Sequence, residues 1–431
     1  MEAEKQRMYL CIDGKCFYAS VECAERGLNP FETNLVVADK NRGKNALCLA
    51  ISPKLKAQGI HNRCRLSDIP RNIQFEIAPP RMQLYIDYCA DIYALYLDYF
   101  APEDIHVYSI DEAFIDVTNY LPMYGMEAKQ LARKLMNEIA NKLLVPTTAG
   151  IGTNLYLAKI ALDIAAKKAR DHMGYLDEEI FRETLWDHMP LTDFWGIAQR
   201  TANRLSHYGI FTMRDIANAD PTLLYKVFGI NAELMIDHAW GRESCLMEDI
   251  KNYRSKSHSI SFSQILSQDN SFDEAAVVMT EMAINGCLEL HKRHVITNRV
   301  GIAVGYSYHE MLPRAEGTIK LPCATQLSSI IEKAVNRKFQ EIVARGVPIR
   351  RLSICFYDTR DEGCEGYDLF TDWAKVDKEK TAERTVLEIQ SKYGKNAVLR
   401  GINLNKAGTQ RERNTFIGGH RAGYDDERKP R

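Results

Sequence analysis

The chain has 431 residues, 45% of them apolar and 26% charged, which is typical of globular proteins and too long for one ordinary domain. Its formal net charge of −1 excludes a strongly basic chain, and no run of about 18 apolar residues predicts a membrane span. Eleven cysteines without a Cys-x-x-Cys pair argue against a zinc site and predict free thiols in the reducing cytoplasm.

The first apolar run, residues 8–12, predicts a buried strand that presents the carboxylate of Asp13 at its carboxyl end. The next elements are predicted to be a helix, two short strands in an irregular stretch, and a long amphipathic helix, at residues 17–26, 34–37, 46–51 and 82–99. Two β-type runs then meet at the acidic tip Asp111-Glu112, which indicates a hairpin. A helix, a strand and a helix follow at residues 125–144, 147–151 and 155–168, so an α/β or α+β layer is expected.

After residue 174 the chain has a pattern of short helices with glycine breaks, which continues to about residue 242. Residues 256–358 predict a compact β-α-β-β-α-β domain, with its helices at 272–292 and 325–345. Residues 251–360 hold 15 Lys or Arg against 10 Asp or Glu, a local basic surplus that could neutralise phosphates. The chain then becomes polar, with one helical run near residues 375–393.

Three carboxylates stand at the ends of predicted strands: Asp13, Asp111 and Glu112. Adjacent carboxylates repel one another, and a divalent cation relieves this repulsion. If the first strand lies beside the hairpin, the three acids can hold two metal ions about 3.5–4 Å apart and support in-line phosphoryl transfer. The alternative for the Asp-Glu pair by itself is a solvated acidic turn.

Three motifs resemble those of the Y-family (translesion) DNA polymerases, and most of all the UmuC-like bacterial branch. The first is DGKCFYASVE at residues 13–22, the second is SIDEAF at 109–114, and the third combines GIGTN at 150–154 with LAKIA at 157–161. Their order and spacing also fit, and the resemblance covers roughly residues 8–360.

The resemblance implies an α+β multidomain fold shaped as a right-hand polymerase. Its expected parts are a palm at 1–23 and 81–170, small fingers at 24–80, a helical thumb with a helix-hairpin-helix at 171–243, a β-α-β-β-α-β little finger at 244–360, and a C-terminal tail at 361–431.

The family's metal ligands fall on Asp13, Asp111, Glu112 and the carbonyl of Gly14, which would hold two Mg²⁺ ions. Phe17 and Tyr18 fall at nucleotide-binding positions, with Tyr18 as the steric gate whose ring leaves no room for a 2′-hydroxyl. Without the motif, Tyr18 would be interpreted as a core aromatic of an amphipathic helix.

Lys159 falls at the family's conserved lysine, which contacts the triphosphate; a solvated helix lysine is the alternative. Many members also have a Tyr-x-x-Arg pair in the fingers, and the matching positions here are Pro53 and Lys56. Lys56 is expected to supply charge to the triphosphate without a bidentate fork, and Ser52 is expected to replace the missing hydroxyl.

Residues 194–202, followed by Leu205 and residues 208–210, resemble the helix-hairpin-helix element. In that element, backbone N–H groups of a glycine-containing turn, here at Gly196 and Ala198, meet a DNA phosphate. The family usually has glycine at the position of Ala198. Five cations on or near the strands of the little finger are further candidates for phosphate contact: Arg254, Lys256, Arg299, Arg350 and Arg351. The alternative for these cations is a solvated sheet edge.

The segment Tyr367-Asp368-Leu369-Phe370 resembles the short motif by which bacterial polymerases dock onto the sliding clamp, although Gly366 stands where glutamine is common. A loop that packs on its own domain is the alternative.

Together these features predict a DNA-directed DNA polymerase for translesion synthesis and DNA repair, of low fidelity and without proofreading. Its expected partners are primer–template DNA, deoxynucleoside triphosphates and the bacterial sliding clamp, and we expect a monomer in the cytoplasm, associated with the nucleoid. The rival hypotheses are a nucleotide cyclase, which also uses a palm and paired acids, and a catalytically inactive DNA-binding scaffold.

Overall fold

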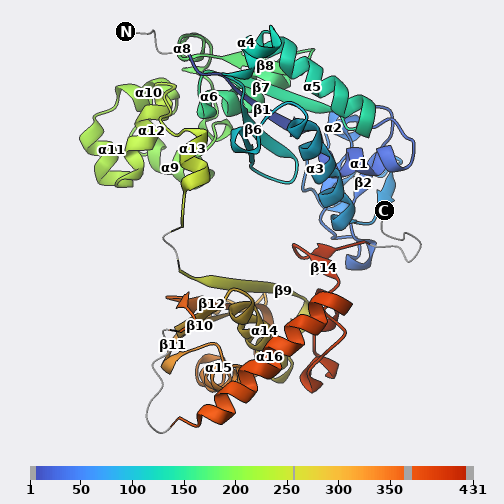
Figure 1. Ribbon diagram of the computed structural model, residues 1–431, viewed down its shortest axis with the longest axis vertical. Helices are drawn as coiled ribbons and strands as arrows, with labels where there is room; N and C mark the ends of the chain where they lie inside the picture. The colour runs from blue at the N-terminus through green and yellow to red at the C-terminus, as the bar shows by residue number, and fades with distance from the viewer. Residues whose placement is uncertain (1–5, 256–257, 364–370, 424–431) are drawn as a thin grey trace. The chain divides into compact units, whose positions relative to one another are not determined.

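The computed structural model describes residues 6–255, 258–363 and 371–423, apart from the side chain of Lys168. The chain forms two compact units, one of Met1–Tyr253 with Ala422–Arg431 and the other of Arg254–Arg421 (Figure 1). We call them unit 1 and unit 2. Within the described ranges, no helix combines the length and the apolar character that crossing a bilayer requires.

Unit 1 is built on a five-stranded sheet of order β5-β6-β1-β7-β8. Its strands are β1 (Tyr9–Gly14), β5 (Ile105–Val107), β6 (Glu112–Asp116), β7 (Thr147–Gly152) and β8 (Met173–Leu176). The apolar strand β1 is central and pairs antiparallel with both β6 and β7. The predicted hairpin of β5 and β6 is therefore confirmed. Strand β8 was not predicted, because only short helices were expected after residue 174.

Helices accompany this sheet. They are α1 (Phe17–Glu25), α3 (Met82–Leu97), α4 (Tyr120–Tyr124), α5 (Ala128–Leu143), α6 (Leu155–Ile160) and α7 (Ala166–Lys168). Of these, α5, α6 and α7 pack directly on the sheet. A π-helical turn, Ala161–Ala165, joins α6 to α7 inside the predicted helix 155–168. A Cβ atom on Gly150 or Gly152 would lie 2.1 or 2.2 Å from the backbone of Ala158, so these glycines let α6 rest directly on β7.

A small three-stranded sheet of order β3-β2-β4 forms the predicted fingers. It consists of β2 (Leu35–Val37), β3 (Ala50–Ile51) and β4 (Glu76–Ala78), with α2 (Pro53–Ala57) beside it. Its core is a compact cluster that includes Val36, Ile51 and Leu55. The strand predicted at 46–51 is shorter in the structure, where residue 47 makes an isolated bridge to Arg65.

The rest of unit 1 is helical, as predicted for the thumb at 171–243. Its helices are α8 (Glu178–Leu185), α9 (Gln199–Ser206), α10 (Met213–Asn218), α11 (Pro221–Phe228), α12 (Asn231–Ala239) and α13 (Met247–Asn252). Phe181, Phe194 and Leu205 are buried together in their shared core with residues of α6. Unit 1 thus also includes α13, which lies in the range predicted for the little finger.

Unit 2 contains the predicted β-α-β-β-α-β domain, with a sheet of order β11-β10-β12-β9 whose neighbours are all antiparallel. The elements are β9 (Ile260–Asn270), α14 (Phe272–Lys292), β10 (Val295–Tyr306), β11 (Ala315–Thr325), α15 (Ser328–Ile342) and β12 (Ile349–Tyr357). Helix α14 begins at Phe272, as predicted, because Ser271 and Glu274 form a capping box. Apolar residues of both helices and of one sheet face form the core, so the other sheet face is left uncovered by α14 and α15.

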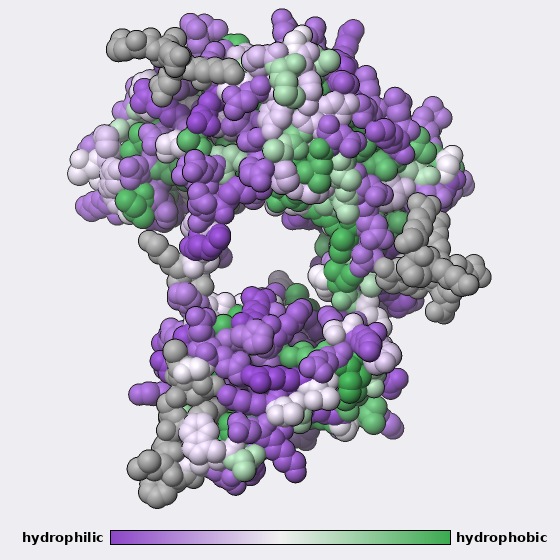
Figure 2. Space-filling view, viewed as in Figure 1, coloured by the Kyte–Doolittle hydropathy of each residue, from purple (hydrophilic) through white to green (hydrophobic). Residues whose placement is uncertain are grey.

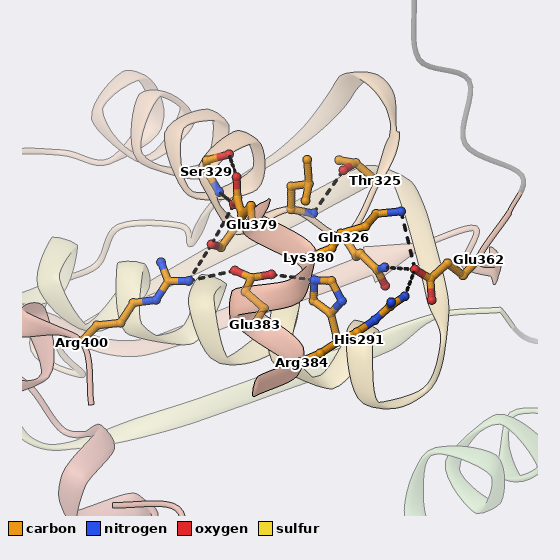
Figure 3. Close-up of polar contacts among 12 residues, drawn as sticks. His291, Thr325, Gln326, Ser329, Glu362, Glu379, Lys380, Glu383, Arg384 and Arg400 are labelled. Atoms are coloured by element: carbon orange, nitrogen blue, oxygen red, sulfur yellow. Dashed lines mark hydrogen bonds and ion pairs between the residues drawn. The ribbon is translucent and has the colours of Figure 1, made fainter. Parts of the chain in front are cut away.

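Residues after 371 are folded as part of unit 2 up to Arg421. They form α16 (Trp373–Tyr393), the short helices Gly401–Leu404 and Gln410–Arg413, and the strands β14 (Phe416–Ile417) and β15 (His420–Arg421). The buried carboxylate of Glu383 on α16 lies 2.5 Å from His291 of α14 and 2.8 Å from Arg400 (Figure 3). The helical run predicted near 375–393 is thus confirmed, and the part of the chain named as a tail packs on the little finger.

Candidate active site

The pairing of β1 with β6 gathers the three acids at one end of the sheet. Asp13 and Glu112 are direct cross-strand partners, and such partners point to the same face with their Cβ atoms about 4.5–5.5 Å apart. Asp111 precedes β6, and its carbonyl accepts a hydrogen bond of 2.8 Å from the N–H of Gly14. Acids remote in the sequence are therefore neighbours in the sheet.

Of the three acids, Asp13 has its pKa raised by its surroundings, whereas Glu112 forms an ion pair. Burial, followed by the charges of Asp111 and Glu112, raises the pKa of Asp13 to about 8. The carboxylate of Glu112 is balanced by the buried ammonium of Lys159 at 2.9 Å. Burial lowers the pKa of Lys159, but the charges of Glu112 and Asp163 outweigh this effect and hold the pKa above its ordinary value.

The donor set fits a divalent cation, because carboxylate oxygens are hard ligands and because Asp13 is largely removed from water beside the charges of Asp111 and Glu112, which together raise its pKa. Across the described residues, however, no group of three His, Cys, Asp or Glu side chains is arranged to hold a metal ion. Glu112 is turned to Lys159 and to the Cys11 thiol at 3.1 Å, and Asp111 accepts a hydrogen bond of 2.7 Å from Ser109. The backbone thus brings the acids together, and the predicted ligand set remains a prediction.

The two aromatic residues of the first motif have different surroundings. Phe17 is buried, and a Cβ atom on Gly14 would lie 2.8 Å from its ring, so Phe17 packs under the strand end as a core residue. The predicted nucleotide contact of Phe17 stays a prediction, and with the side chain buried it would have to be made by the backbone. Tyr18 is partly exposed and stacks on Tyr85, with ring centroids 4.5 Å apart and an interplanar angle of 20°.

Comparison with known proteins decides the family. A family model described as impB/mucB/samB matches residues 12–163, and the model of that family's C-terminal domain matches residues 254–369. The putative UV-damage repair protein UvrX of Bacillus subtilis (strain 168) is 31% identical over 96% of this chain and 97% of its own length. DNA polymerase IV 2 of the same organism is 29% identical over 96% of this chain and 99% of its own.

The solved structure of a Y-family DNA polymerase chimera, Dbh-Dpo4(243-245)-Dbh, covers 82% of this chain and 100% of its own with a TM-score of 0.63 and 20% identity, which shows the same fold. The chain belongs to the Y family of DNA polymerases. This polymerase is therefore a DNA-directed enzyme of translesion synthesis and DNA repair, which acts on DNA and nucleotides and depends on divalent metal ions. Its fold is the right hand of palm, fingers, thumb and little finger.

Two residues of α2 and its N-cap were predicted to contact the triphosphate, and they differ in exposure. The Ser52 hydroxyl of the polymerase is fully buried and accepts hydrogen bonds from the N–H groups of Leu35 and Leu55, at 3.2 and 3.4 Å. Ser52 is thus the N-cap of α2 and has no exposed hydroxyl for a phosphate. Lys56, at the other end of α2, is exposed.

Lys15 is a cation that sequence reasoning missed. Its ammonium lies 3.3 Å from the Nε2 atom of His172, and burial together with the charge of Lys56 lowers its pKa. Three groups that can carry positive charge, Lys15, Lys56 and His172, therefore lie close to the end of β1. The signal that could have identified Lys15 is its place two residues after Asp13, inside the first motif.

The predicted thumb turn of the polymerase is exposed at Gly196 and Ala198 and anchored by the buried Phe194 and Ile197. Gly196 has φ +90°, a conformation that favours glycine. Ala198 has φ −86° and ψ 168° as the N-cap of α9, so alanine fits without strain where the family usually has glycine.

The uncovered face of the unit 2 sheet carries several small side chains. By register these are Ser261, Ser263, Gly301, Ala303, Gly305, Ser353 and Cys355. Arg351 is exposed on this face, whereas Arg350 lies in a bulge of β12 and pairs with Asp269 at 3.4 Å. In Figure 2 the surface over β9 and β10 is mainly hydrophilic.

Arg299 belongs to the same sheet face as Arg351, and it pairs with Asp358 at 3.0 Å and lies over the ring of Tyr357. Arg254 is exposed at the start of unit 2. Two predictions lie outside the described residues: the phosphate contact of Lys256 and the clamp motif at residues 367–370.

Proposed function

We propose that the polymerase extends a primer by attack of the 3′-hydroxyl on the α-phosphate of a deoxynucleoside triphosphate, with pyrophosphate as the leaving group. Two Mg²⁺ ions held by Asp13, Asp111, Glu112 and the Gly14 carbonyl would lower the pKa of the hydroxyl and neutralise phosphate charge. The observation that carries this proposal is the cross-strand pairing of Asp13 with Glu112, with Asp111 one residue away.

The phosphates need further positive charge, and three lysines supply it in this proposal. The ammonium of Lys159 lies 2.9 Å from Glu112, one of the acids that would hold the metal ions, so it can add positive charge beside the phosphates that those ions would bind. Lys56 lies on α2 of the fingers, and its charge lowers the pKa of Lys15. Together the two ammonium groups can neutralise phosphate charge where many family members use a bidentate arginine.

Primer extension with purified protein tests this function. We expect Mg²⁺-dependent addition of deoxynucleotides to a primer, both on an intact template and across an abasic site or a pyrimidine dimer. The same reactions, analysed for cyclic nucleotide products, test the cyclase alternative. Absence of extension under all metal conditions, with DNA binding retained, would favour the inactive scaffold instead.

The sugar gate gives the first specific prediction. Tyr18→Ala is expected to raise incorporation of ribonucleotides by about 100-fold relative to deoxynucleotides, because the ring that excludes the 2′-hydroxyl is gone. The measurement is kcat/KM for dCTP and CTP opposite template guanine. Tyr225→Ala, which removes an exposed tyrosine of α11, is the control. Wild-type selectivity in Tyr18→Ala would remove the gate from this residue.

DNA binding is proposed to involve the thumb turn at Gly196 and the open face of the unit 2 sheet. The exposed backbone N–H groups of the turn can meet a phosphate without sequence preference. On the sheet, small side chains let the DNA backbone approach closely, and Arg351 and Arg299 provide charge.

The sheet face gives a second prediction. Arg351→Ala is expected to lower the slope of log K against log salt by about 1 for primer–template binding, because one phosphate contact is lost. Fluorescence anisotropy between 50 and 200 mM salt, roughly the range in which such contacts matter, measures the slope. Arg337→Ala, an exposed arginine on α15 of the opposite layer, should leave it unchanged. Equal slopes for both variants would exclude this face from DNA binding.

Other properties follow from the same proposal. A fingers part with only a small apolar core is expected to close loosely over the nascent base pair, which permits damaged templates and low fidelity without proofreading. We further propose docking of Tyr367-Asp368-Leu369-Phe370 onto the sliding clamp, on the resemblance of these residues to the clamp motif. The enzyme is proposed to act as a monomer at the nucleoid, in the cytoplasm, because its template is there.

A further inference from the structure

The gate residue Tyr18 rests on a second tyrosine from another helix. Tyr85 of α3 is fully buried, and its ring is nearly parallel to that of Tyr18 at a centroid distance of 4.5 Å. Offset stacking of this kind favours one ring orientation over others. The orientation of Tyr18 therefore depends on where the ring of Tyr85 is held.

The ring of Tyr85 is fixed at its far end by a buried carboxylate. Its hydroxyl donates a hydrogen bond of 2.8 Å to Glu22, which is fully buried on α1, one helical turn after Tyr18. Arg81 donates two further bonds to the same carboxylate, at 2.9 and 2.7 Å, and Arg26 pairs with it as well. A carboxylate with this many charge-assisted donors has little freedom to move.

The Tyr18–Tyr85 stack and the Tyr85–Glu22 hydrogen bond both join α1 to α3. Glu22 and Tyr18 are four residues apart on α1, so their side chains lie on the same side of that helix. Arg81 and Tyr85 are likewise four residues apart at the start of α3. Tyr85 of α3 thus contacts α1 twice, through the ring of Tyr18 and through the carboxylate of Glu22.

We propose that Tyr85 is a positioning residue for sugar selection: it holds the ring of Tyr18 in the orientation that excludes a 2′-hydroxyl. The inference rests on the proposed gate role of Tyr18 and extends it to a residue that no motif of the sequence includes. Tyr85 lies beneath the gate, and it acts on the nucleotide through the ring of Tyr18.

The chain offers a matched control on the same helix. Tyr88, three residues after Tyr85, donates a hydrogen bond of 2.9 Å to Glu25 of α1. It therefore makes the same kind of Tyr–Glu link between α3 and α1, but the gate ring stacks on Tyr85. Loss of Tyr88 tests whether any loosening of the two helices is enough to change sugar selection.

The experiment compares kcat/KM for a deoxynucleotide and the matching ribonucleotide in wild type, Tyr85→Leu, Tyr85→Phe, Tyr88→Leu and Tyr18→Ala. Tyr85→Leu is expected to lower discrimination about 3- to 10-fold, the range that one aromatic pair supports, with deoxynucleotide incorporation within about threefold of wild type. Tyr85→Phe keeps the stack and is expected to recover at least half of the lost discrimination. Tyr88→Leu is expected to leave discrimination unchanged.

Wild-type discrimination in Tyr85→Leu, together with its loss in Tyr18→Ala, would overturn the inference and leave the gate intact. An equal loss in Tyr85→Leu and Tyr88→Leu would also overturn it, because general loosening of α3 would then explain both. Wild-type discrimination in Tyr18→Ala would remove the gate proposal itself. Circular dichroism and thermal melting verify that each variant is folded, and Tyr85→Met, which keeps a long apolar side chain, replaces Tyr85→Leu if the latter does not fold.

Discussion

Asp111→Ala is expected to reduce primer extension by about 1,000-fold or more in kcat while primer–template affinity stays within twofold of wild type, a loss expected when charge stabilisation at the reacting phosphate is removed. The carboxylate of Asp111 is hydrogen-bonded by Ser109, and its contribution to the sheet is the backbone carbonyl that Gly14 contacts. Alanine keeps that carbonyl, so the turn and the β1–β6 pairing are preserved. A loss of activity then reports the missing carboxylate alone.

The same test at Glu112 is less clean, because the carboxylate of Glu112 is the partner of the buried Lys159. Removal of the Glu112 carboxylate leaves a buried ammonium with Asp163 as its remaining acidic partner, so it lowers the stability of the fold as well as the activity.

Asp87→Ala is the control for Asp111→Ala, since Asp87 is an exposed acid on α3 of the same unit. Single-turnover extension gives kcat, and anisotropy gives DNA affinity. Activity of Asp111→Ala within tenfold of wild type would exclude Asp111 as a catalytic ligand.

Asp13→Asn is expected to abolish extension and yet to stabilise the metal-free protein at pH 8. The folded-state pKa of Asp13 is raised to about 8 from an ordinary value of 3.8. Between these two values the folded protein keeps a proton that the unfolded chain releases, so the free energy of unfolding decreases as pH rises through this window. Asparagine cannot ionise and avoids the cost, which is a few kcal/mol at pH 8 by order of magnitude.

Thermal melts in EDTA at pH 5, 6.5 and 8 measure this effect. The melting temperature of Asp13→Asn relative to wild type is expected to rise with pH, reaching about 5 °C or more at pH 8. Mg²⁺ is expected to stabilise wild type at pH 8 and to have a much smaller effect on Asp13→Asn, because the cation favours the ionised carboxyl. Asp87→Asn should track wild type at every pH. A difference between Asp13→Asn and wild type that does not change with pH would contradict the proposed charge crowding.

The arrangement of the acids illustrates a trade between stability and activity. A carboxyl that is half buried beside two others stores repulsion in the metal-free protein, and a bound cation removes it. Lys159 provides a partial substitute through its ion pair with Glu112. It lies just before the π-helical turn Ala161–Ala165, a distortion that often marks functional sites in helices.

The sequence by itself determined the parts of this polymerase that depend on local pattern. The hairpin with its acidic tip, the bounds of α14 and the β-α-β-β-α-β order follow from apolar periodicity and capping residues, which act over a few positions. The three motifs identified the family, and with it the acids at Asp13 and Glu112. Motif matching assigns residue roles from their order along the chain and requires no knowledge of the distances between side chains.

Only the tertiary structure decided which side chains those residues meet. The fold buries the hydroxyl of Ser52 and the ring of Phe17, and it places Arg350 at a bulge of β12, where Arg350 pairs with Asp269. Lys15 and Tyr85 gained their neighbours from segments remote in the sequence. Burial, pairing register and bulges arise from contacts between distant parts of the chain, and the periodicity of a single segment does not encode them.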